Sequence, residues 1–405
     1  MYYRIALLCL PFALLAACAP QEAPASRPDL GPSGVLLLCQ AQFITGDQGA
    51  PVPGPARLEL VRVLDGRWDR AVLEDPLSNV FHKAMIVISE EDTALFTIGG
   101  NAAALTRWKT GRIPSEPERI WQPVFGGKHN RVRDIERGDV DGDGLADWVM
   151  ATHDQGVVAV ARRVGEDWEI VEVDGSPDTF VHEIEIGDAD GDGQVEFYAT
   201  PSKPNRASGE SQAGAVLQYA WDGQRWARAV VDSFADTHAK EILVADLDGT
   251  GDALYVVKEA VISPGVAEPL APVSIVRYRK TDDQWRSDTV ATIPDRQCRF
   301  LLATDLDGNN SLELVAAGFK TGLWWIKPGA TVPWQRELID GDSSGFEHAC
   351  TSADMDGDGT EELYVAADDQ KELRRYVRRG GVFQREAILP LTGDVITWGL
   401  TAGRM

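Results

Sequence analysis

A nine-residue loop rich in aspartate recurs along the sequence and is its clearest candidate for chemistry. The best copy, residues 354–362, reads DMDGDGTEE, with carboxylates at positions one, three, five and nine and glycines at positions four and six. Alternate side chains of a tight loop can converge on one point, where carboxylates repel one another unless a hard cation lies among them. Oxygen ligands with glycines at the bend are typical of calcium sites.

The pattern occurs four times in full and once in a degraded form. The predicted calcium ligands are Asp139, Asp141, Asp143 and Asp147 in the first full copy, Asp188, Asp190, Asp192 and Glu196 in the second, Asp305, Asp307, Asn309 and Glu313 in the third, and Asp354, Asp356, Asp358 and Glu362 in the fourth. The degraded copy keeps Asp246, Asp248 and Asp252 but has Thr250 at position five and Leu254 at position nine. We therefore expect Ca²⁺ in four loops, and the sequence leaves undecided whether the fifth loop binds it.

The elements that position these loops are predicted to be β-strands. An EF-hand would need a bidentate glutamate at position twelve and a helix on each side. Position twelve is apolar in every copy: Met150, Ala199, Val257, Ala316 and Val365. The segment after each loop, for example 363–366, is short, apolar and rich in β-forming residues. Each loop is therefore predicted to join two strands of a sheet.

Aromatic residues recur with the same period and mark a further strand in each repeat. They are Trp68, Trp121, Trp168, Trp226, Trp285, Trp334 and Phe383. A strand before the loop, a strand after it and a hairpin make four strands in about fifty to sixty residues, which is typical of a β-propeller blade. The leftover strand 396–401 would complete the blade of 34–75. The sequence thus predicts an all-β, seven-bladed ring without an open sheet edge.

The loop pattern between two strands, repeated on a propeller period, resembles the FG-GAP/VCBS repeat family. That family includes the propellers of integrin α-chains and of many bacterial surface proteins. The motif covers residues 131–389, and only the periodicity extends the resemblance to the two N-terminal blades. The resemblance implies the fold and a structural calcium ion that pins one end of each inner strand. It does not imply one activity.

The N-terminal segment is expected to be an export signal. Residues 1–17 combine one basic residue with an apolar run too short to span a bilayer, which is typical of a signal peptide. Residues 15–18 (LAAC) resemble the lipobox of bacterial lipoproteins, which implies diacylation of Cys18 and a lipid anchor in the membrane. Ala19 follows instead of aspartate, which by the same resemblance favours the outer membrane, facing the periplasm or the cell surface. Residues 18–33 are predicted to be a tether, and 34–405 the propeller.

The charge and cysteine content exclude several function classes. A formal charge of −24 and a pI near 4.6 argue against nucleic acid as a partner. After Cys18, only Cys39, Cys298 and Cys350 remain, so no disulfide framework is predicted. The sequence contains no Gly-x-Ser-x-Gly elbow, phosphate loop or dinucleotide fingerprint.

A second set of candidate residues lies six positions before each loop. These residues are Arg133, His182, Lys240, Arg299 and His348, joined by Phe81 with its neighbour His82 and by Trp398 in the closing strand. Six residues of a strand span about 20 Å, at about 3.3 Å each. We therefore expect these side chains at the opposite rim of the central channel, where two long segments, 201–214 and 263–272, are also expected to emerge.

Three interpretations of this rim stay open from the sequence. It could line a water-filled channel, with its basic residues paired to the adjacent Asp134, Glu183 and Glu241. It could bind a small anion or an acidic saccharide through Arg133, His182, Lys240, Arg299 and His348. It could also catalyse a sugar or polysaccharide lyase reaction, with His182, His348 and Arg299 as candidate catalytic residues. The sequence favours a binding or interaction module, with the lyase as the alternative.

Overall fold

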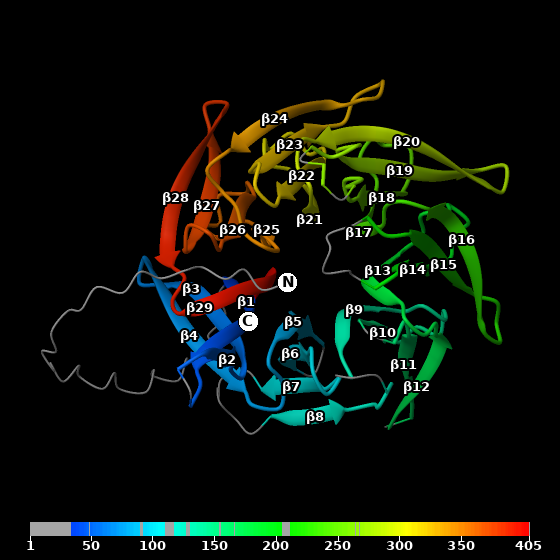
Figure 1. Ribbon diagram of the computed structural model, residues 1–405, viewed down its shortest axis with the longest axis horizontal. Coiled ribbons are helices and arrows are strands. Elements are labelled where there is room, and N and C mark those ends of the chain that lie inside the picture. Colours follow the sequence, from blue (N-terminus) through cyan, green and yellow to red (C-terminus); the bar gives the residue numbers. More distant parts are fainter. Residues whose placement is uncertain are drawn as a thin grey trace, which may run out of the picture.

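The computed structural model describes residues 34–404 except 48, 90–91, 110–116, 127–129, 154, 166, 205–210, 264 and 267. The expected signal peptide, the tether and Cys18 lie outside these residues. The described chain is all β, and its strands form seven antiparallel sheets arranged in a ring (Figure 1). No helix among the described residues is long or apolar enough to cross a membrane. The predicted seven-bladed propeller is confirmed.

Six blades are each made by four consecutive strands. They are β5 (Phe81–Ile88), β6 (Thr93–Gly99), β7 (Leu105–Lys109) and β8 (Glu118–Trp121); β9 (Val132–Gly138), β10 (Asp147–Thr152), β11 (Val158–Val164) and β12 (Asp167–Asp174); β13 (Phe180–Gly187), β14 (Glu196–Ser202), β15 (Gly214–Trp221) and β16 (Trp226–Phe234); β17 (Ala239–Ala245), β18 (Ala253–Lys258), β19 (Val273–Thr281) and β20 (Gln284–Ile293); β21 (Cys298–Thr304), β22 (Glu313–Gly318), β23 (Leu323–Lys327) and β24 (Gln335–Asp340); and β25 (Cys350–Ala353), β26 (Glu362–Ala367), β27 (Glu372–Arg379) and β28 (Val382–Pro390).

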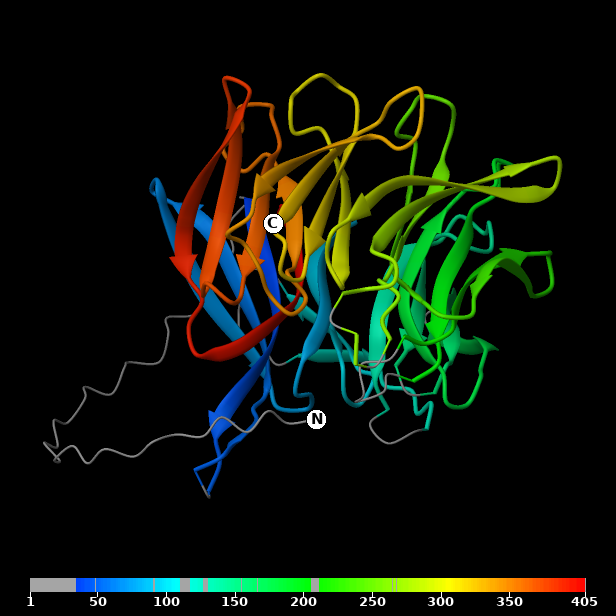
Figure 2. The same cartoon turned by 45° about the horizontal axis from the view of Figure 1, so that its top comes forward.

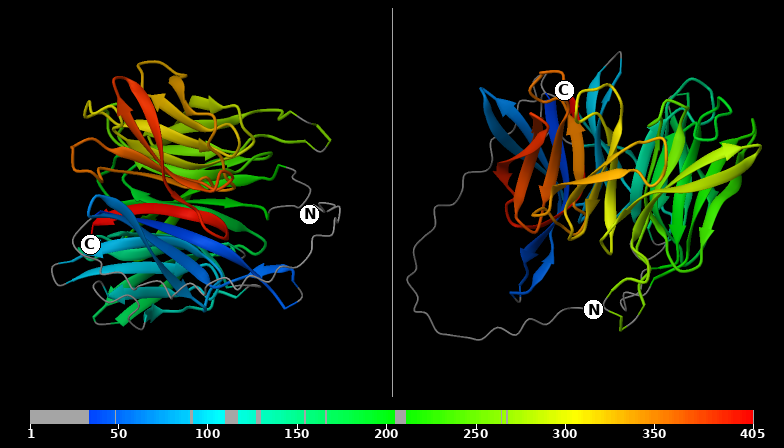
Figure 3. Two further views of the ribbon diagram at one scale, coloured as in Figure 1. Left: turned by 90° about the vertical axis from the view of Figure 1, so that its left-hand side faces the viewer. Right: turned by 90° about the horizontal axis from the view of Figure 1, so that it is seen from above.

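The seventh blade joins the two ends of the described chain. Strands β1 (Gly34–Thr45), β3 (Ala56–Leu64) and β4 (Arg67–Asp75) come from one end, and β29 (Asp394–Arg404) comes from the other. Strand β29 pairs with β1 from Gly34↔Arg404 to Phe43↔Asp394. The short strand β2 (Pro51–Pro53) pairs with the end of β1 and extends this hairpin away from the ring (Figures 2 and 3). The predicted closure by the leftover C-terminal strand is confirmed.

The hydrophobic core lies between neighbouring blades, where the periodic aromatic residues pack. Trp285 of β20 contacts Tyr198 of the preceding blade with ring centroids 6.2 Å apart. One blade later, Trp334 contacts Tyr255 of its preceding blade, with ring centroids 5.9 Å apart. Such pairs bury large apolar area and lock each blade against the next. The cysteines Cys39, Cys298 and Cys350 are free and buried.

Candidate functional site

The four full aspartate loops connect the first and second strands of their blades. In each loop the residue at position nine is the first residue of the second strand: Asp147, Glu196, Glu313 and Glu362. Asp139 at position one accepts the backbone N–H groups of Gly142 at 2.8 Å and Gly144 at 2.9 Å. Both glycines have positive φ, of 75° and 86°, a conformation that glycine adopts without strain. The spacing of the motif therefore bends the loop so that its carboxylates converge.

Within each of the four full loops, carboxylate oxygens of three or four residues lie within 4.8 Å of one another. The converging sets are Asp139, Asp141 and Asp147; Asp188, Asp190, Asp192 and Glu196; Asp305, Asp307 and Glu313; and Asp354, Asp356 and Glu362. Asp143 and Asp358 fall outside these sets, and each accepts a backbone N–H group two residues further on. Of the three carboxylates at position five, only Asp192 of the second loop therefore belongs to a converging set.

Buried oxygen atoms in these loops have no hydrogen-bond partner among the described residues. They include Oδ1 of Asp147 and Oε1 of Glu196, whose residues are each 1% exposed. Burial, followed by the other carboxylates of each loop, raises the pKa of Asp147 and of Glu196 to about 7. Orphaned buried oxygens facing further carboxylates are the donor set that a hard cation such as Ca²⁺ would satisfy.

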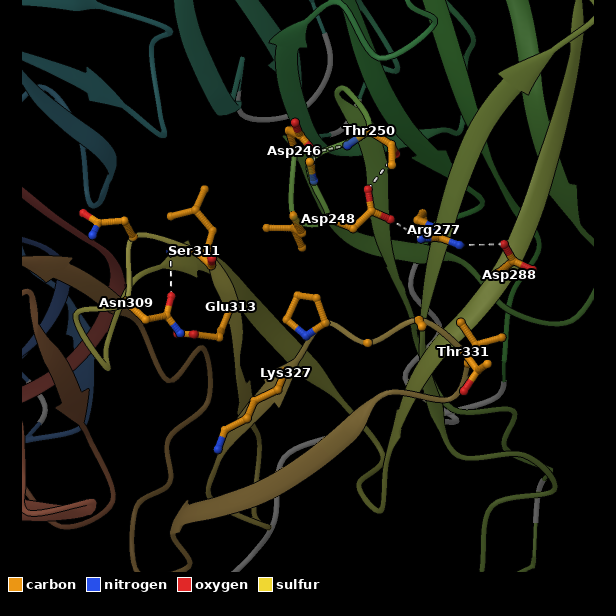
Figure 4. Close-up of a pocket in the computed structure, with 18 of the residues that line it drawn as sticks. Asp246, Asp248, Thr250, Arg277, Asp288, Asn309, Ser311, Glu313, Lys327 and Thr331 are labelled. Atoms are coloured by element: carbon orange, nitrogen blue, oxygen red, sulfur yellow. Dashed lines mark hydrogen bonds and ion pairs between the residues drawn. The ribbon is translucent and has the colours of Figure 1, made fainter.

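The degraded loop is neutralised by the protein itself. Asp248 contacts Arg277 Nη1 at 2.9 Å and Arg279 Nη2 at 2.7 Å, and it accepts the hydroxyl of Thr250 at 2.6 Å (Figure 4). Although burial raises the pKa of Asp248, the hydrogen bonds from Arg279 and Thr250 lower it to about 2. Two guanidinium groups therefore compensate Asp248, whereas a single basic side chain contacts the position-three carboxylate in three of the full loops: Arg162 at Asp141, Lys280 at Asp190 and Arg375 at Asp356.

A groove of about 1450 Å³ separates this loop from the next one, at residues 305–313 (Figure 4). Its basic side chains are already paired within the protein. Arg277 reaches Asp288 at 3.0 Å in addition to Asp248, and Lys327 contacts Glu337 at 3.1 Å. The groove thus offers few uncompensated charges to a ligand.

At the opposite end of the inner strands, six of the seven blades carry a β-bulge. The extra residue is His82 in β5, Arg133 in β9, His182 beside Glu183 in β13, Lys240 in β17, Arg299 in β21 and Trp398 in β29. A bulge leaves one residue out of the ladder and turns its side chain. We call the channel opening ringed by these bulges the mouth. His82, not the core residue Phe81, occupies the bulge of its blade.

Glu347 is a mouth residue that the sequence did not single out. It is 1% exposed, and its carboxylate contacts Arg299 Nη1 at 2.5 Å and Arg133 Nη2 at 3.6 Å. Burial raises the pKa of Glu347, but the two arginines lower it more, so the carboxylate is ionised. Two of the predicted anion-binding residues, Arg133 and Arg299, therefore already share an internal carboxylate. The only sequence signal was an acid beside His348, like the acids beside Arg133, His182 and Lys240.

His348 lies just before β25 and not at a bulge. Its φ is 57°, and its ring is fully buried. Nδ1 lies 2.7 Å from the carbonyl oxygen of Gly318, and Nε2 lies 2.8 Å from the hydroxyl of Ser343. Burial lowers the pKa of His348 to about 4, so the ring is neutral at pH 7. Both nitrogens have protein partners, which leaves neither of them for a ligand.

His182 is also fully buried and bonded at both nitrogens. Nε2 lies 2.8 Å from Ser202 Oγ, and Nδ1 lies 3.0 Å from Lys240 Nζ. Ser202 donates its proton to the carbonyl oxygen of Lys203 at 3.0 Å. The hydroxyl must then accept the His182 Nε2–H group, so Nδ1 accepts from Lys240. Burial and the positive charge of Lys240 lower the pKa of His182 well below its usual value.

Several buried polar atoms at the mouth have no hydrogen-bond partner within the described chain. The donors are Nε1 of Trp398 and Nε of Arg299, and the acceptors are Oε1 of Glu259 and Oε2 of Glu347. Aromatic rings lie beside them. Phe346, which is 41% exposed, is 6.0 Å from Trp398 between ring centroids, and Trp398 stacks on His82 at 5.0 Å. The mouth thus combines an exposed aromatic surface with unsatisfied groups of both kinds.

The channel wall next to the mouth is acidic. Lys83 contacts Asp134 at 3.1 Å and also Glu136. Burial, then neighbouring carboxylates, raises the pKa of Glu183 and of Glu241 well above the usual range, and that of Glu185 to about 8. The concentration of basic residues predicted from the sequence is therefore offset by acids in the same space.

Comparison with known proteins identifies similar folds only. No protein-family model and no curated protein sequence matches this chain. Among solved structures, the periplasmic gluconolactonase of Pseudomonas aeruginosa is 14% identical with a TM-score of 0.56, covering 91% of this chain and 99% of that one. A candidate 6-phosphogluconolactonase of Bacteroides fragilis is 11% identical with a TM-score of 0.52, covering 92% and 98%. At these identities the likeness establishes the propeller fold and nothing further.

Proposed function

We propose that this protein is a calcium-stabilised β-propeller lipoprotein that binds a saccharide at the mouth. The observation that carries the proposal is the mixture of unsatisfied donors and acceptors beside Phe346 and Trp398. A sugar hydroxyl both donates and accepts, so one polyhydroxylated ligand can satisfy a guanidinium N–H, an indole N–H and a carboxylate together. The apolar face of a sugar ring can pack on an exposed aromatic side chain.

A simple anion fits the mouth less well than a saccharide does. Arg133 and Arg299 already contact Glu347, so an anion would have to displace an internal carboxylate. An anion without a proton also cannot satisfy Glu259 Oε1, which has no hydrogen-bond partner among the described residues. A neutral saccharide meets none of these obstacles.

In this proposal the calcium ions act as structural ties and take no part in ligand binding. They would be held by the converging carboxylates of the four full loops, and the orphaned oxygens of Asp147 and Glu196 support that assignment. The loops lie at the far end of the inner strands from the mouth. The FG-GAP/VCBS resemblance, the lipid at Cys18 and the outer-membrane location belong to the same proposal and rest on the sequence motifs alone.

Calorimetric titration of the calcium-loaded protein with neutral hexoses, uronic acids and oligosaccharides tests the proposal. The Phe346→Ala variant should bind at least about tenfold more weakly, which corresponds to about 1.4 kcal/mol. Val382→Ala, which removes an apolar side chain that is 66% exposed on the β27–β28 hairpin, is the matched control and should bind normally. Absence of binding throughout the panel, or equal binding by the two variants, would refute the proposal.

Catalysis on a bound sugar is the second candidate function. His182 and His348 have no free nitrogen, but Lys240 lies at a bulge of the mouth beside His182. A neutral lysine amine could serve as the base that a lyase requires. Assays for an unsaturated sugar product, and for lactone consumption in view of the gluconolactonase structures, should then show activity that Lys240→Met abolishes. A fully active variant would exclude Lys240 as that base.

A further inference from the structure

We propose that Lys240 is a nucleophilic amine that forms an imine with the aldehyde group of a small carbonyl compound, such as an open-chain reducing sugar. The inference rests on the proposed function only for the choice of a sugar as the natural ligand. The reactivity of the amine follows from its own surroundings.

Lys240 is a buried lysine without an acidic partner. The residue is 4% exposed and lies at the bulge of β17, next to the channel. Among the described residues its Nζ makes one hydrogen bond, to Nδ1 of His182, and no carboxylate lies within 4.0 Å of it. Buried lysines are rare unless an ion pair compensates their charge. An uncompensated buried amine favours its neutral form.

Neighbouring charges favour the neutral form further. Burial and then the guanidinium of Arg299 lower the pKa of Lys240 to about 7, with Arg133 acting in the same direction. The carboxylates of Glu347 and Glu259 oppose this effect only in part. At neutral pH about half of the amine is therefore unprotonated, against less than about one part in a thousand for an ordinary lysine. Desolvation beside another cation is a recognised way to make a lysine nucleophilic.

The hydrogen-bond direction orients the amine. Because Ser202 donates to Lys203 and accepts from His182 Nε2–H, His182 can only accept at Nδ1. One N–H bond of Lys240 must then point at His182, so the nitrogen lone pair is directed away from that ring. The histidine acts here as a positioning residue for the amine.

The chemistry needs no reagent beyond the amine and the aldehyde. The nitrogen lone pair attacks the carbonyl carbon and forms the C–N bond, which gives a carbinolamine. The two amine protons pass to the carbonyl oxygen, which leaves as water as the C=N bond forms. Glu259 lies more than 4.0 Å from the amine and can carry these protons through an intervening water, because burial raises its pKa to about 7 and its Oε1 has no hydrogen-bond partner among the described residues. Addition of water reverses every step.

Lys83 provides a matched control within the same channel. It lies beside the bulge residue His82 of β5, but it is ion-paired with Asp134 and Glu136. Although burial lowers the pKa of Lys83, these two carboxylates raise it well above its usual value. Lys320, whose side chain is 53% exposed, provides a surface control.

Reductive trapping tests the inference on the full chain. The protein is incubated with D-glyceraldehyde and cyanoborohydride at pH 7, and the modified lysines are located by peptide mass spectrometry. Lys240 should be labelled at least ten times faster than Lys83 and Lys320, and raising the pH to 9 should increase labelling of Lys320 manyfold but that of Lys240 by no more than about twofold. Labelling of Lys240 no faster than that of Lys320 overturns the proposal.

Two further measurements distinguish the role of Glu259, the reactivity of Lys240 and the binding of a saccharide. Glu259→Gln should slow labelling of Lys240 severalfold and leave Lys320 unchanged, and an unchanged rate at Lys240 overturns the role given to Glu259. If glyceraldehyde labels Lys240 while no saccharide binds, the reactive amine stands and the proposed saccharide function fails. If a saccharide binds and Lys240 stays unlabelled, the proposed function stands and the amine chemistry fails.

Discussion

Replacing Asp147 by asparagine should change the stability of the protein in opposite directions with and without calcium. Asp147 is buried at position nine of its loop, and its Oδ1 has no hydrogen-bond partner in the described chain. Without a cation its negative charge destabilises the folded state, because other carboxylates of the loop lie within 4.8 Å and repel it. With a cation the same charge becomes a ligand. Asparagine keeps the shape of the side chain and removes the charge.

The size of the expected stability change follows from the shifted pKa of Asp147. Burial, then Asp141, Asp143 and Asp139, raises the pKa of Asp147 from 3.8 to about 7, which amounts to about 4 kcal/mol against the ionised form. Because the folded-state pKa is raised, this group's stabilising contribution is complete below about pH 4 and is lost as the pH rises through 7. At pH 8 without calcium the variant should therefore be more stable by about 2 to 4 kcal/mol. At about 0.8 kcal/mol/K for a domain of this size, its Tm should rise by about 3 to 5 °C.

Calcium should reverse this order. A ligand at about ten thousand times its Kd stabilises by about 5.5 kcal/mol for each site, so the wild type with four sites should gain about 22 kcal/mol. The variant should lose one site's share of about 5.5 kcal/mol against its gain of about 2 to 4 kcal/mol, and should therefore melt about 2 to 4 °C below the wild type. Differential scanning calorimetry at pH 8, in EDTA and in excess calcium, measures both cases. Asp248→Asn is the control, because its arginine partners should make its effect equal in both buffers.

The reasoning would be refuted by either of two results. One is a wild-type Tm that calcium does not raise, which would mean that the loops do not bind this cation. The other is an Asp147→Asn variant that is less stable than the wild type in EDTA at pH 8. The uncompensated negative charge inferred from the loop geometry would then be absent.

Three further predictions concern the mouth, the ring closure and the cysteines. Glu347→Gln should lower the free energy of unfolding by about 3 kcal/mol in urea titrations, because it leaves the buried guanidinium of Arg299 without its carboxylate and removes one of the two carboxylates that contact Arg133; a loss below about 1 kcal/mol would contradict this. Leu400→Ala, in the closing strand, should lower the free energy of unfolding by about 2 to 5 kcal/mol and speed amide hydrogen exchange in β1. An unchanged exchange rate in β1 would argue against closure of the ring by β29. Cys39, Cys298 and Cys350 should not react with Ellman's reagent until the propeller unfolds, since burial raises the pKa of their thiols, and rapid reaction of any of them in the native state would contradict their burial.

The blades could be predicted from the sequence because their signals are local. The aspartate motif marks where the first strand ends and the second begins, and position nine is the first residue of the second strand in all four full loops. The periodic aromatic residues mark the outer hairpin, where Trp285 and Trp334 pack against the preceding blade. The strand left over at residues 396–401 had only one incomplete sheet to join. Each of these inferences needed a spacing of a few residues.

The arrangement of the mouth could not be predicted in the same way. Counting six residues back from each loop located Arg133 and Arg299 at the rim, but it assumed regular alternation and so could not show the bulges. The partner of both arginines, Glu347, lies in a segment without a strand, and it is 214 residues from Arg133 in the sequence. The same segment gives His348 a positive φ and a fully buried ring. Ion pairs across the ring depend on the closed fold, which no local spacing encodes.

The bulges bear on how such a protein can acquire a new ligand. The extra residue of each bulge stands outside the ladder of hydrogen bonds, so its identity is not constrained by strand pairing. Substitution at Lys240 or Arg299 therefore alters the mouth while the blade and its neighbours keep their register. A lineage built on this scaffold can revise its recognition surface one blade at a time, and a library that varies only these positions would sample new specificities on an unchanged fold.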